Sequence, residues 1–267
     1  MTLDPNVSEW LNLFARWFHV FAGILWIGTT YFFTWLDGRF QEGAKEGGQV
    51  WMVHSGGFYV VDKRKTPGQS ELHWFRWEAA LTWLSGFVLL VLVYYVGGGA
   101  LIDKDVRDIS LLTGVGIGVG TLVVSWVVYD MLSQSPLGRN ETAFAAVSYA
   151  LVVVVAYGLT QVLSGRAAYI HVGAMFGTIM AANVWMRILP AQRQMIGATS
   201  KGEQPDARLA ARAKLRSKHN TFMVVPVVFT MISNHFPAAT YGSRYNWVIL
   251  SGLILLGWFV AKIIRRA

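Results

Sequence analysis

Seven long apolar stretches set the strongest constraint on how this chain can fold. They cover residues 11–36, 77–96, 109–132, 143–163, 167–189, 219–236 and 245–264. Each is long enough to cross a hydrocarbon core of roughly 30 Å as a helix of about 20 residues. Hydrophobic residues make up 54% of the 267 residues and charged residues 14%, a balance that is unusual for a soluble domain. We therefore predict an all-α integral membrane protein, with about seven transmembrane helices in a single domain over residues 1–267.

The distribution of lysine and arginine predicts the orientation in the membrane. Most basic residues fall in the connections 37–76 and 190–218 and in the C-terminal tail, whereas few fall on the opposite side. The positive-inside rule then places the N-terminus outside and the C-terminus in the cytoplasm. No cleavable signal precedes the first apolar stretch, so we expect that stretch to remain as a helix.

The two long cytoplasmic connections are expected to contact membrane lipids. Residues 37–76 contain the aromatic, glycine-bearing segment WMVHSGGFYVV, which we expect to fold against the membrane face. Residues 190–218 contain a basic stretch from Pro205 that is typical of an amphipathic helix on an anionic leaflet. We therefore interpret the net charge of +8 as basic residues that set the membrane orientation and contact lipid headgroups, and not as a sign of nucleic-acid binding.

Cysteine is absent from the sequence. This excludes disulfides, iron–sulfur clusters, a cysteine nucleophile and the covalent attachment of haem c to this chain. A redox cofactor would have to be held by histidine or by other side chains.

The six histidines separate by their predicted depth. His19, His171 and His235 fall toward the outer side, and His54, His73 and His219 fall toward the inner side. His19 and His171 are the deepest, and glycines follow both within a turn, as a flat macrocycle between helices requires. We therefore hypothesise that this pair ligates a b-type haem; interfacial hydrogen bonding and close helix packing are the alternatives.

The inner histidines leave two arrangements open. His73 and His219 could ligate a second haem, or His54 could join them in a three-histidine site for iron or copper. His235 is a further candidate cofactor ligand at the outer end of the sixth stretch. The sequence does not choose between these arrangements.

Four other polar residues in the apolar stretches are candidates for function. Glu78 could act as an acid or base if it is poorly solvated, or could pair with Arg76. Arg16 could pair with a haem propionate or with lipid headgroups. Asp130 is a second carboxylate close to the inner side. Asn183 lies deeper and is expected to hydrogen-bond to a neighbouring helix or to a ligand.

Several sequence blocks resemble one family, the membrane domain of the bacterial membrane-bound urate oxidases (urate hydroxylases). They are RWFHVFAGILWIG, HSGGFY, LHWFRWEAALTWLSG, SPLGRNE, GTIMAANVWMRILPAQR and KHNTFMVVPVVFTMISNHFP, in this order. The resemblance implies a bacterial inner (cytoplasmic) membrane location. It also implies oxidation of urate to 5-hydroxyisourate, with water supplying the oxygen and electrons leaving to a cytochrome c. Long family members carry a C-terminal cytochrome c domain that this sequence lacks, so we expect the acceptor to be a separate protein or subunit on the outer side.

These expectations combine into one functional hypothesis. Urate is an anion, so a cation-rich inner pocket near His54, His73 and His219 would bind it, with Glu78 as a base. Haem b in both leaflets would carry electrons to the outer side. The alternative is a haem-b-carrying electron-transfer or anchor subunit of a larger respiratory complex, without urate activity of its own. A transporter is disfavoured because intramembrane charges are few and no inverted repeat is visible.

Overall fold

The computed structural model describes residues 4–42, 48–64, 71–96 and 99–265. The helices are α1 (Pro5–Glu42), α2 (Trp77–Leu90), α3 (Leu111–Gln134), α4 (Glu141–Thr160), α5 (Gly165–Asn183), α6 (Leu189–Ser200), α7 (Ala207–Ile232) and α8 (Asn246–Ile264). Two π-helical turns, η1 (Val91–Val96) and η3 (Val184–Ile188), continue α2 and α5, and two 3-10 turns, η2 (Pro136–Arg139) and η4 (Ser233–His235), lie between helices. The predicted all-α class is confirmed, because the described residues contain six helices long and apolar enough to cross a membrane.

Side-chain caps fix where several helices begin. An oxygen at the N-cap position accepts a hydrogen bond from one of the first backbone N–H groups, which otherwise lack a partner. The caps of α3, α4, α5 and α7 are Ser110, Asn140, Ser164 and Asp206. Short polar segments in the sequence thus set the helix boundaries at both ends of the bundle.

α7 differs most from the expected apolar stretch. The sequence indicated a span over 219–236, whereas α7 begins at Ala207 and its first half is rich in basic residues. Because of these charged residues, α7 is not one of the six helices apolar enough to cross a membrane. It nevertheless packs against both α5 and α8. Residues 190–218 are therefore mostly helical: α5 continues through η3 and α6 to Ser200, and α7 starts a few residues later.

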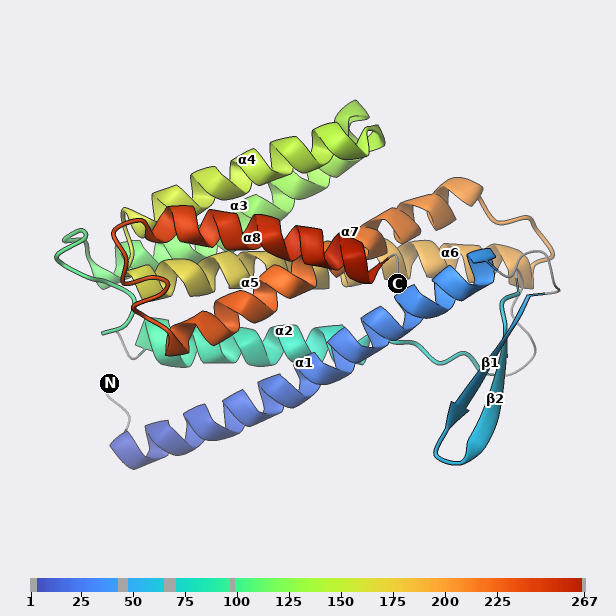
Figure 1. Ribbon diagram of the computed structural model, residues 1–267, viewed down its shortest axis with the longest axis horizontal. Coiled ribbons are helices and arrows are strands. Elements are labelled where there is room, and N and C mark those ends of the chain that lie inside the picture. Colours follow the sequence, from blue (N-terminus) through green and yellow to red (C-terminus); the bar gives the residue numbers. More distant parts are fainter. Residues whose placement is uncertain (1–3, 43–47, 65–70, 97–98, 266–267) are drawn as a thin grey trace.

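α5 lies in the middle of the bundle, and α1 runs diagonally along one side of it against α2 (Figure 1). Close approach between α5 and α7 depends on Gly173, where an added Cβ would lie 2.1 Å from the Thr230 hydroxyl. Small residues allow this kind of packing between membrane helices. α3 and α4 form a pair that diverges from α8 toward the right of Figure 1.

We call this right-hand side the basic end; α1, α3 and α8 end there, and α2, α4 and α7 begin there (Figure 1). The long basic connections predicted from the sequence fall at this end. The orientation of the basic end toward the cytoplasm stays a prediction.

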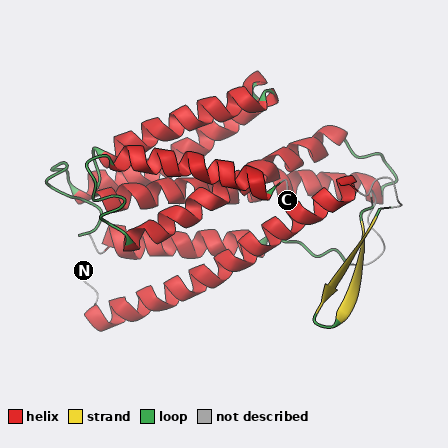
Figure 2. Cartoon of the chain, viewed as in Figure 1, coloured by secondary structure: helices red, strands yellow, loops and turns green. Residues whose placement is uncertain are grey.

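A β-hairpin extends from the basic end beside α1 and is the sheet drawn in Figure 2. Its strands β1 (Gln49–His54) and β2 (Gly57–Asp62) pair antiparallel. Ser55 and Gly56 have positive φ angles at the two-residue turn, as tight hairpins require. The aromatic segment that was expected to fold against the membrane face thus forms a hairpin with exposed apolar side chains.

Candidate functional site

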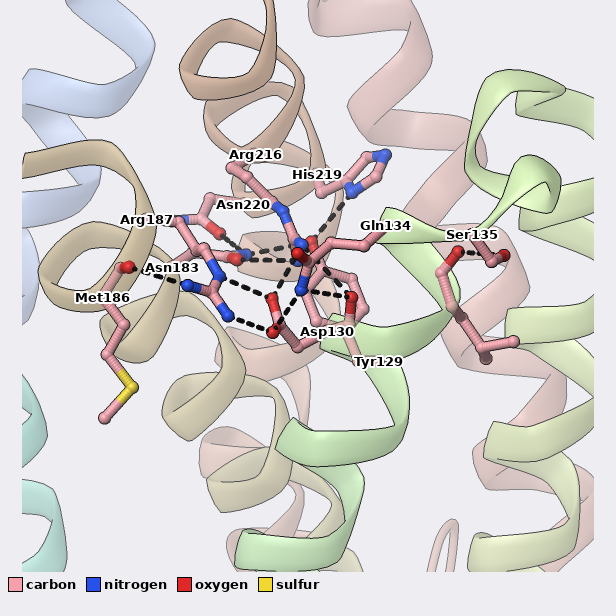
Figure 3. Close-up of polar contacts among 11 residues, drawn as sticks. Tyr129, Asp130, Gln134, Ser135, Asn183, Met186, Arg187, Arg216, His219 and Asn220 are labelled. Atoms are coloured by element: carbon pink, nitrogen blue, oxygen red, sulfur yellow. Dashed lines mark hydrogen bonds and ion pairs between the residues drawn. The ribbon is translucent and has the colours of Figure 1, made fainter. Parts of the chain in front are cut away.

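A buried ionic cluster joins α3, η3 and α7 near the basic end (Figure 3). The Asp130 carboxylate accepts hydrogen bonds from Arg187 Nε at 2.9 Å, Arg216 Nη2 at 2.8 Å and Gln134 Nε2 at 2.7 Å. Arg187 Nη2 also donates to this carboxylate. Two cations therefore share one anion, and the cluster carries one excess positive charge.

Burial makes this cluster structurally demanding. Arg216 is only 1% exposed and Asp130 8%. A charge that is removed from water must be paired and hydrogen-bonded, and loss of one partner leaves an uncompensated charge. Asp130 therefore holds α3 to both η3 and α7.

An amide chain leads from the cluster to His219. Asn183 accepts from Arg216 Nη1 at 3.3 Å, and its Nδ2 donates to the Asn220 side-chain oxygen at 2.9 Å and to the Tyr129 hydroxyl at 3.0 Å. Asn220 in turn donates to the Met180 carbonyl at 3.1 Å. The prediction that Asn183 bonds to neighbouring helices is confirmed.

The direction of these hydrogen bonds assigns the tautomer of His219. The Tyr129 hydroxyl accepts from Asn183, so its own proton is available for His219 Nδ1 at 2.8 Å. A ring nitrogen that accepts must be unprotonated, and the other nitrogen of a neutral imidazole then carries the proton. His219 Nε2 is thus a donor, and this nitrogen points away from the cluster (Figure 3).

His219 lines a large cavity of about 1310 Å³ between α3, α4, α5, α7 and α8. Phe144 stacks on the imidazole with ring centroids 4.8 Å apart, which fixes the ring against α4. Most of the remaining lining is apolar, including Val152, Met175 and Phe176. His219 therefore stands at the border between the polar network and an apolar chamber.

The cavity mouth at the basic end is cationic. Lys218, Lys262 and Arg265 line it together with a single carboxylate, Glu141. Lys218 Nζ lies 2.7 Å from Glu141, so that pair is neutral and two cations remain. Desolvation lowers the pKa of the Arg265 guanidinium, and the Glu141 charge opposes this shift. A small anion would relieve the cost of burying Arg265.

The two histidines predicted to share a haem lie against different helices. His19 Nδ1 is 3.0 Å from both Thr82 O and Ser85 Oγ on α2, and its ring lies on Gly86. His171 is fully buried against α3, where a Cβ on Gly118 would lie 2.5 Å from its Nε2.

Both ring nitrogens of His171 already have partners. Nδ1 lies 2.8 Å from the Ala167 carbonyl and Nε2 3.0 Å from the Tyr95 hydroxyl. A macrocycle would need open space beside Nε2, and Gly118 and Tyr95 occupy it. The residues as arranged do not fit a haem between His19 and His171.

The inner histidines are also not brought together. His54 is at the hairpin tip, where its Nδ1 lies 2.8 Å from Ser55 Oγ. His73 packs edge-to-face against Phe75, with ring centroids 4.5 Å apart. His219 contacts neither. Among the described ranges, no group of three histidine or acidic side chains is placed to hold a metal ion.

The other predicted residues lie away from the cavity. His235, in η4 at the opposite end, and Arg16, on α1, are exposed. Glu78 lies in the first turn of α2, where its Oε2 is buried without a hydrogen-bond partner in the described part of the chain. It does not line the cavity. The predicted pairing of Glu78 with Arg76 is not among the ion pairs of the described residues.

Sequence reasoning missed Tyr129, Arg216 and Lys218. Arg216, His219 and Asn220 follow an i, i+3, i+4 spacing, which places them on one face of α7. That spacing was the available signal, but the basic stretch around it indicated a surface helix.

The family comparison agrees with this architecture. A family model described as urate oxidase N-terminal matches residues 5–266. Neither a curated protein nor a solved structure gives a significant match to the chain. The matched range includes every helix of the bundle, and the chain therefore belongs to the urate oxidase N-terminal family.

Proposed function

We propose that this protein is a membrane-bound oxidoreductase that converts urate, or a closely related purine anion, to 5-hydroxyisourate. Family membership supports the substrate class. The cationic mouth supports an anionic substrate, because Lys262 and Arg265 have no carboxylate of their own within salt-bridge distance in the described residues.

The observation that carries the proposal is the position of His219. Its Nε2–H is directed away from the Tyr129 network, at the border of the cationic mouth. A purine anion offers carbonyl oxygens in one plane, and such an oxygen would accept this hydrogen bond. We assign His219 to binding and orienting the purine, and Lys262 and Arg265 to its negative charge.

The reaction balances as a two-electron oxidation. Urate and one water give 5-hydroxyisourate, two protons and two electrons; a C–O bond forms at C5 and one O–H bond of the water breaks. Glu78 and His54 have no part in this assignment, because neither lines the cavity. The proposed reaction includes no haem, since the predicted histidine pairs are not arranged to ligate a haem.

The experiment uses the purified full chain in lipid nanodiscs, with urate and ferricyanide as an artificial one-electron acceptor. We expect urate loss with two equivalents of ferricyanide reduced, and a drop of at least about tenfold in kcat/KM for His219→Ala, as loss of a charge-assisted contact predicts. His235→Ala is the matched control, because His235 is exposed at the other end. Absence of urate loss, or equal activity in His219→Ala and the wild type, would refute the proposal.

A further inference from the structure

The cavity beside His219 extends far beyond its cationic mouth. Its lining runs from Glu141 to Val155 on α4 and from Arg265 to Gly252 on α8, about 20 Å along each helix at a rise of 1.5 Å per residue. One leaflet of a bilayer fills half of a hydrocarbon core of roughly 30 Å, which is about 15 Å. The cavity is therefore deep enough to hold the hydrocarbon chain of a lipid, and deeper than a purine requires.

Charge and apolar surface are separated along this depth. The charged residues of the lining, Glu141, Lys218, Lys262 and Arg265, all lie at the mouth, where α4 begins and α8 ends. Beyond the mouth the walls are mostly apolar, and buried side chains such as Met175 contribute to them. Water finds few hydrogen-bond partners in such a space. The deep part is therefore suited to a hydrocarbon chain.

The cavity is open on the side formed by α3, α4 and α8. Val124 of α3, Leu151 of α4 and Phe259 of α8 line it and are 59%, 39% and 60% exposed. The α3–α4 pair diverges from α8 (Figure 1). All three helices are long and apolar enough to cross a membrane, so this side borders lipid. A ligand in the cavity can therefore keep part of itself in the bilayer.

Two cations at the mouth are left for a ligand. Lys262 and Arg265 are three residues apart and thus lie on one face of α8. A hydrogen bond of 2.7 Å to the Thr221 hydroxyl holds the Arg265 guanidinium toward α7. Among the described residues, Glu141 is the one carboxylate of the lining, and it pairs with Lys218. The mouth therefore complements a negative charge at the end of the bundle where lipid headgroups lie.

A ligand that fits these features has an acidic head and a long apolar chain. We propose that the cavity binds an anionic phospholipid of the surrounding membrane, with its phosphate on Lys262 and Arg265 and one acyl chain in the apolar part. The second acyl chain stays in the bilayer on the open side. This opening favours a two-chain phospholipid over a free fatty acid, whose single chain would leave the open side unused.

The lipid and the purine would use the same two cations. The proposed function assigns Lys262 and Arg265 to the charge of the purine, so a bound phospholipid excludes urate from the mouth. The anionic lipid content of the membrane then sets the apparent affinity for urate. This competition rests on the proposed function, whereas the lipid site itself does not.

Native mass spectrometry of the full chain tests the headgroup contacts. The protein is released from micelles that contain equal amounts of dioleoyl-phosphatidylglycerol and dioleoyl-phosphatidylcholine, which have the same chains and differ in net charge. We expect one retained phosphatidylglycerol, preferred about 25-fold, because each of two basic residues near a lipid surface contributes about fivefold. Lys262→Gln and Arg265→Gln should each lower the preference about fivefold. Lys214→Gln is the matched control, since Lys214 is exposed at the same end and lies outside the lining.

Gly252 allows a separate test of the acyl chain. It lines the deep part of the cavity, and a Cβ at this position would meet nothing within 4 Å. Gly252→Phe should lower phosphatidylglycerol retention at least about tenfold, because even two methylene groups that lose their burial account for this factor. Gly158→Phe is the matched control, since Gly158 on α4 is equally unobstructed and lies outside the lining. If Gly252→Phe does not fold, the two charge variants decide.

The retained species decide whether the site exists. Equal retention of the two phospholipids overturns it, and so does a preference that is unchanged in both Lys262→Gln and Arg265→Gln. Oleic acid is added as a third competitor, and its retention in place of phosphatidylglycerol overturns the assignment to a phospholipid.

Urate oxidation in nanodiscs tests the competition. Replacing phosphatidylcholine by phosphatidylglycerol should raise the KM for urate about threefold or more at unchanged kcat in the wild type and in Gly158→Phe. The rise should be smaller in Gly252→Phe, which also controls for repulsion of urate by the negative membrane surface. An equal rise in all three proteins, or none, overturns the competition. Absence of urate oxidation in either lipid refutes the proposed function, and the mass spectra still decide the lipid site.

Discussion

His171 and His219 each lie next to a tyrosine hydroxyl, but their environments are opposite. His171 is fully buried on α5, and its two ring nitrogens contact the Ala167 carbonyl and the Tyr95 hydroxyl. His219 on α7 uses Nδ1 for the Tyr129 hydroxyl and directs Nε2 away from the network.

The hydrogen-bond partners also select opposite tautomers. A carbonyl can only accept, so His171 carries its proton on Nδ1 and accepts from Tyr95 at Nε2. Tyr129 donates to His219, so the proton there is on Nε2. Burial depth alone therefore does not identify a functional histidine. The useful criterion is whether one ring nitrogen is left for a ligand.

The largest effect is expected where the His219 network is anchored. Asp130→Ala should lower the free energy of unfolding by about 3–5 kcal/mol, because Arg216 would remain buried without its carboxylate. Denaturant unfolding in detergent micelles measures this. Asp108→Ala is the control. Asp108 pairs with Lys104 at 3.9 Å, and because both side chains are exposed the pair is worth less than about 1 kcal/mol. An Asp130→Ala protein as stable as the control would contradict the structural role of the cluster.

The next largest effect is expected at His171, whose two ring nitrogens both have partners. His171→Ala should cost about 2–4 kcal/mol, because it removes a packed ring and leaves the Tyr95 hydroxyl without its partner. Urate turnover per folded molecule should stay within about twofold of the wild type. Unfolding and turnover are measured on the same preparation. If turnover disappeared while stability was retained, His171 would return as a candidate ligand.

The smallest effect separates the two tyrosines. Tyr95→Phe should cost about 1 kcal/mol in stability, as expected for one hydrogen bond, and Tyr129→Phe about 2 kcal/mol, because its hydroxyl bonds to both Asn183 and His219. Only Tyr129→Phe should also reduce urate turnover, by about threefold or more, because His219 would lose the donor that fixes its tautomer. Equal turnover in the two variants would mean that the His219 tautomer is not set by Tyr129.

The sequence predicted much of the bundle. Six of the expected apolar stretches correspond to the apolar helices, and the basic connections fall at one end, because hydropathy and charge are local properties of the chain. Asn183 was correctly expected to bond across helices, since an amide in an apolar helix needs partners.

The sequence was less informative about the candidate site. The basic start of α7 indicated a surface helix. Arg216 on this helix is nevertheless buried, and it donates hydrogen bonds to Asp130 of α3 and to the side-chain oxygen of Asn183. The predicted haem pairs matched by depth, but depth does not say which helix each ring faces. His19 lies against Gly86 of α2 and His171 against Gly118 of α3.

The sequence by itself determined the membrane class, the approximate spans and the family resemblance. Only the tertiary structure decided which polar residues meet. Helix neighbours and helix rotation depend on contacts between residues far apart in the chain, such as Asp130 with Arg216 and Tyr129 with His219. The tautomer of His219 and the cavity beneath it follow from those contacts, and no local pattern contains them.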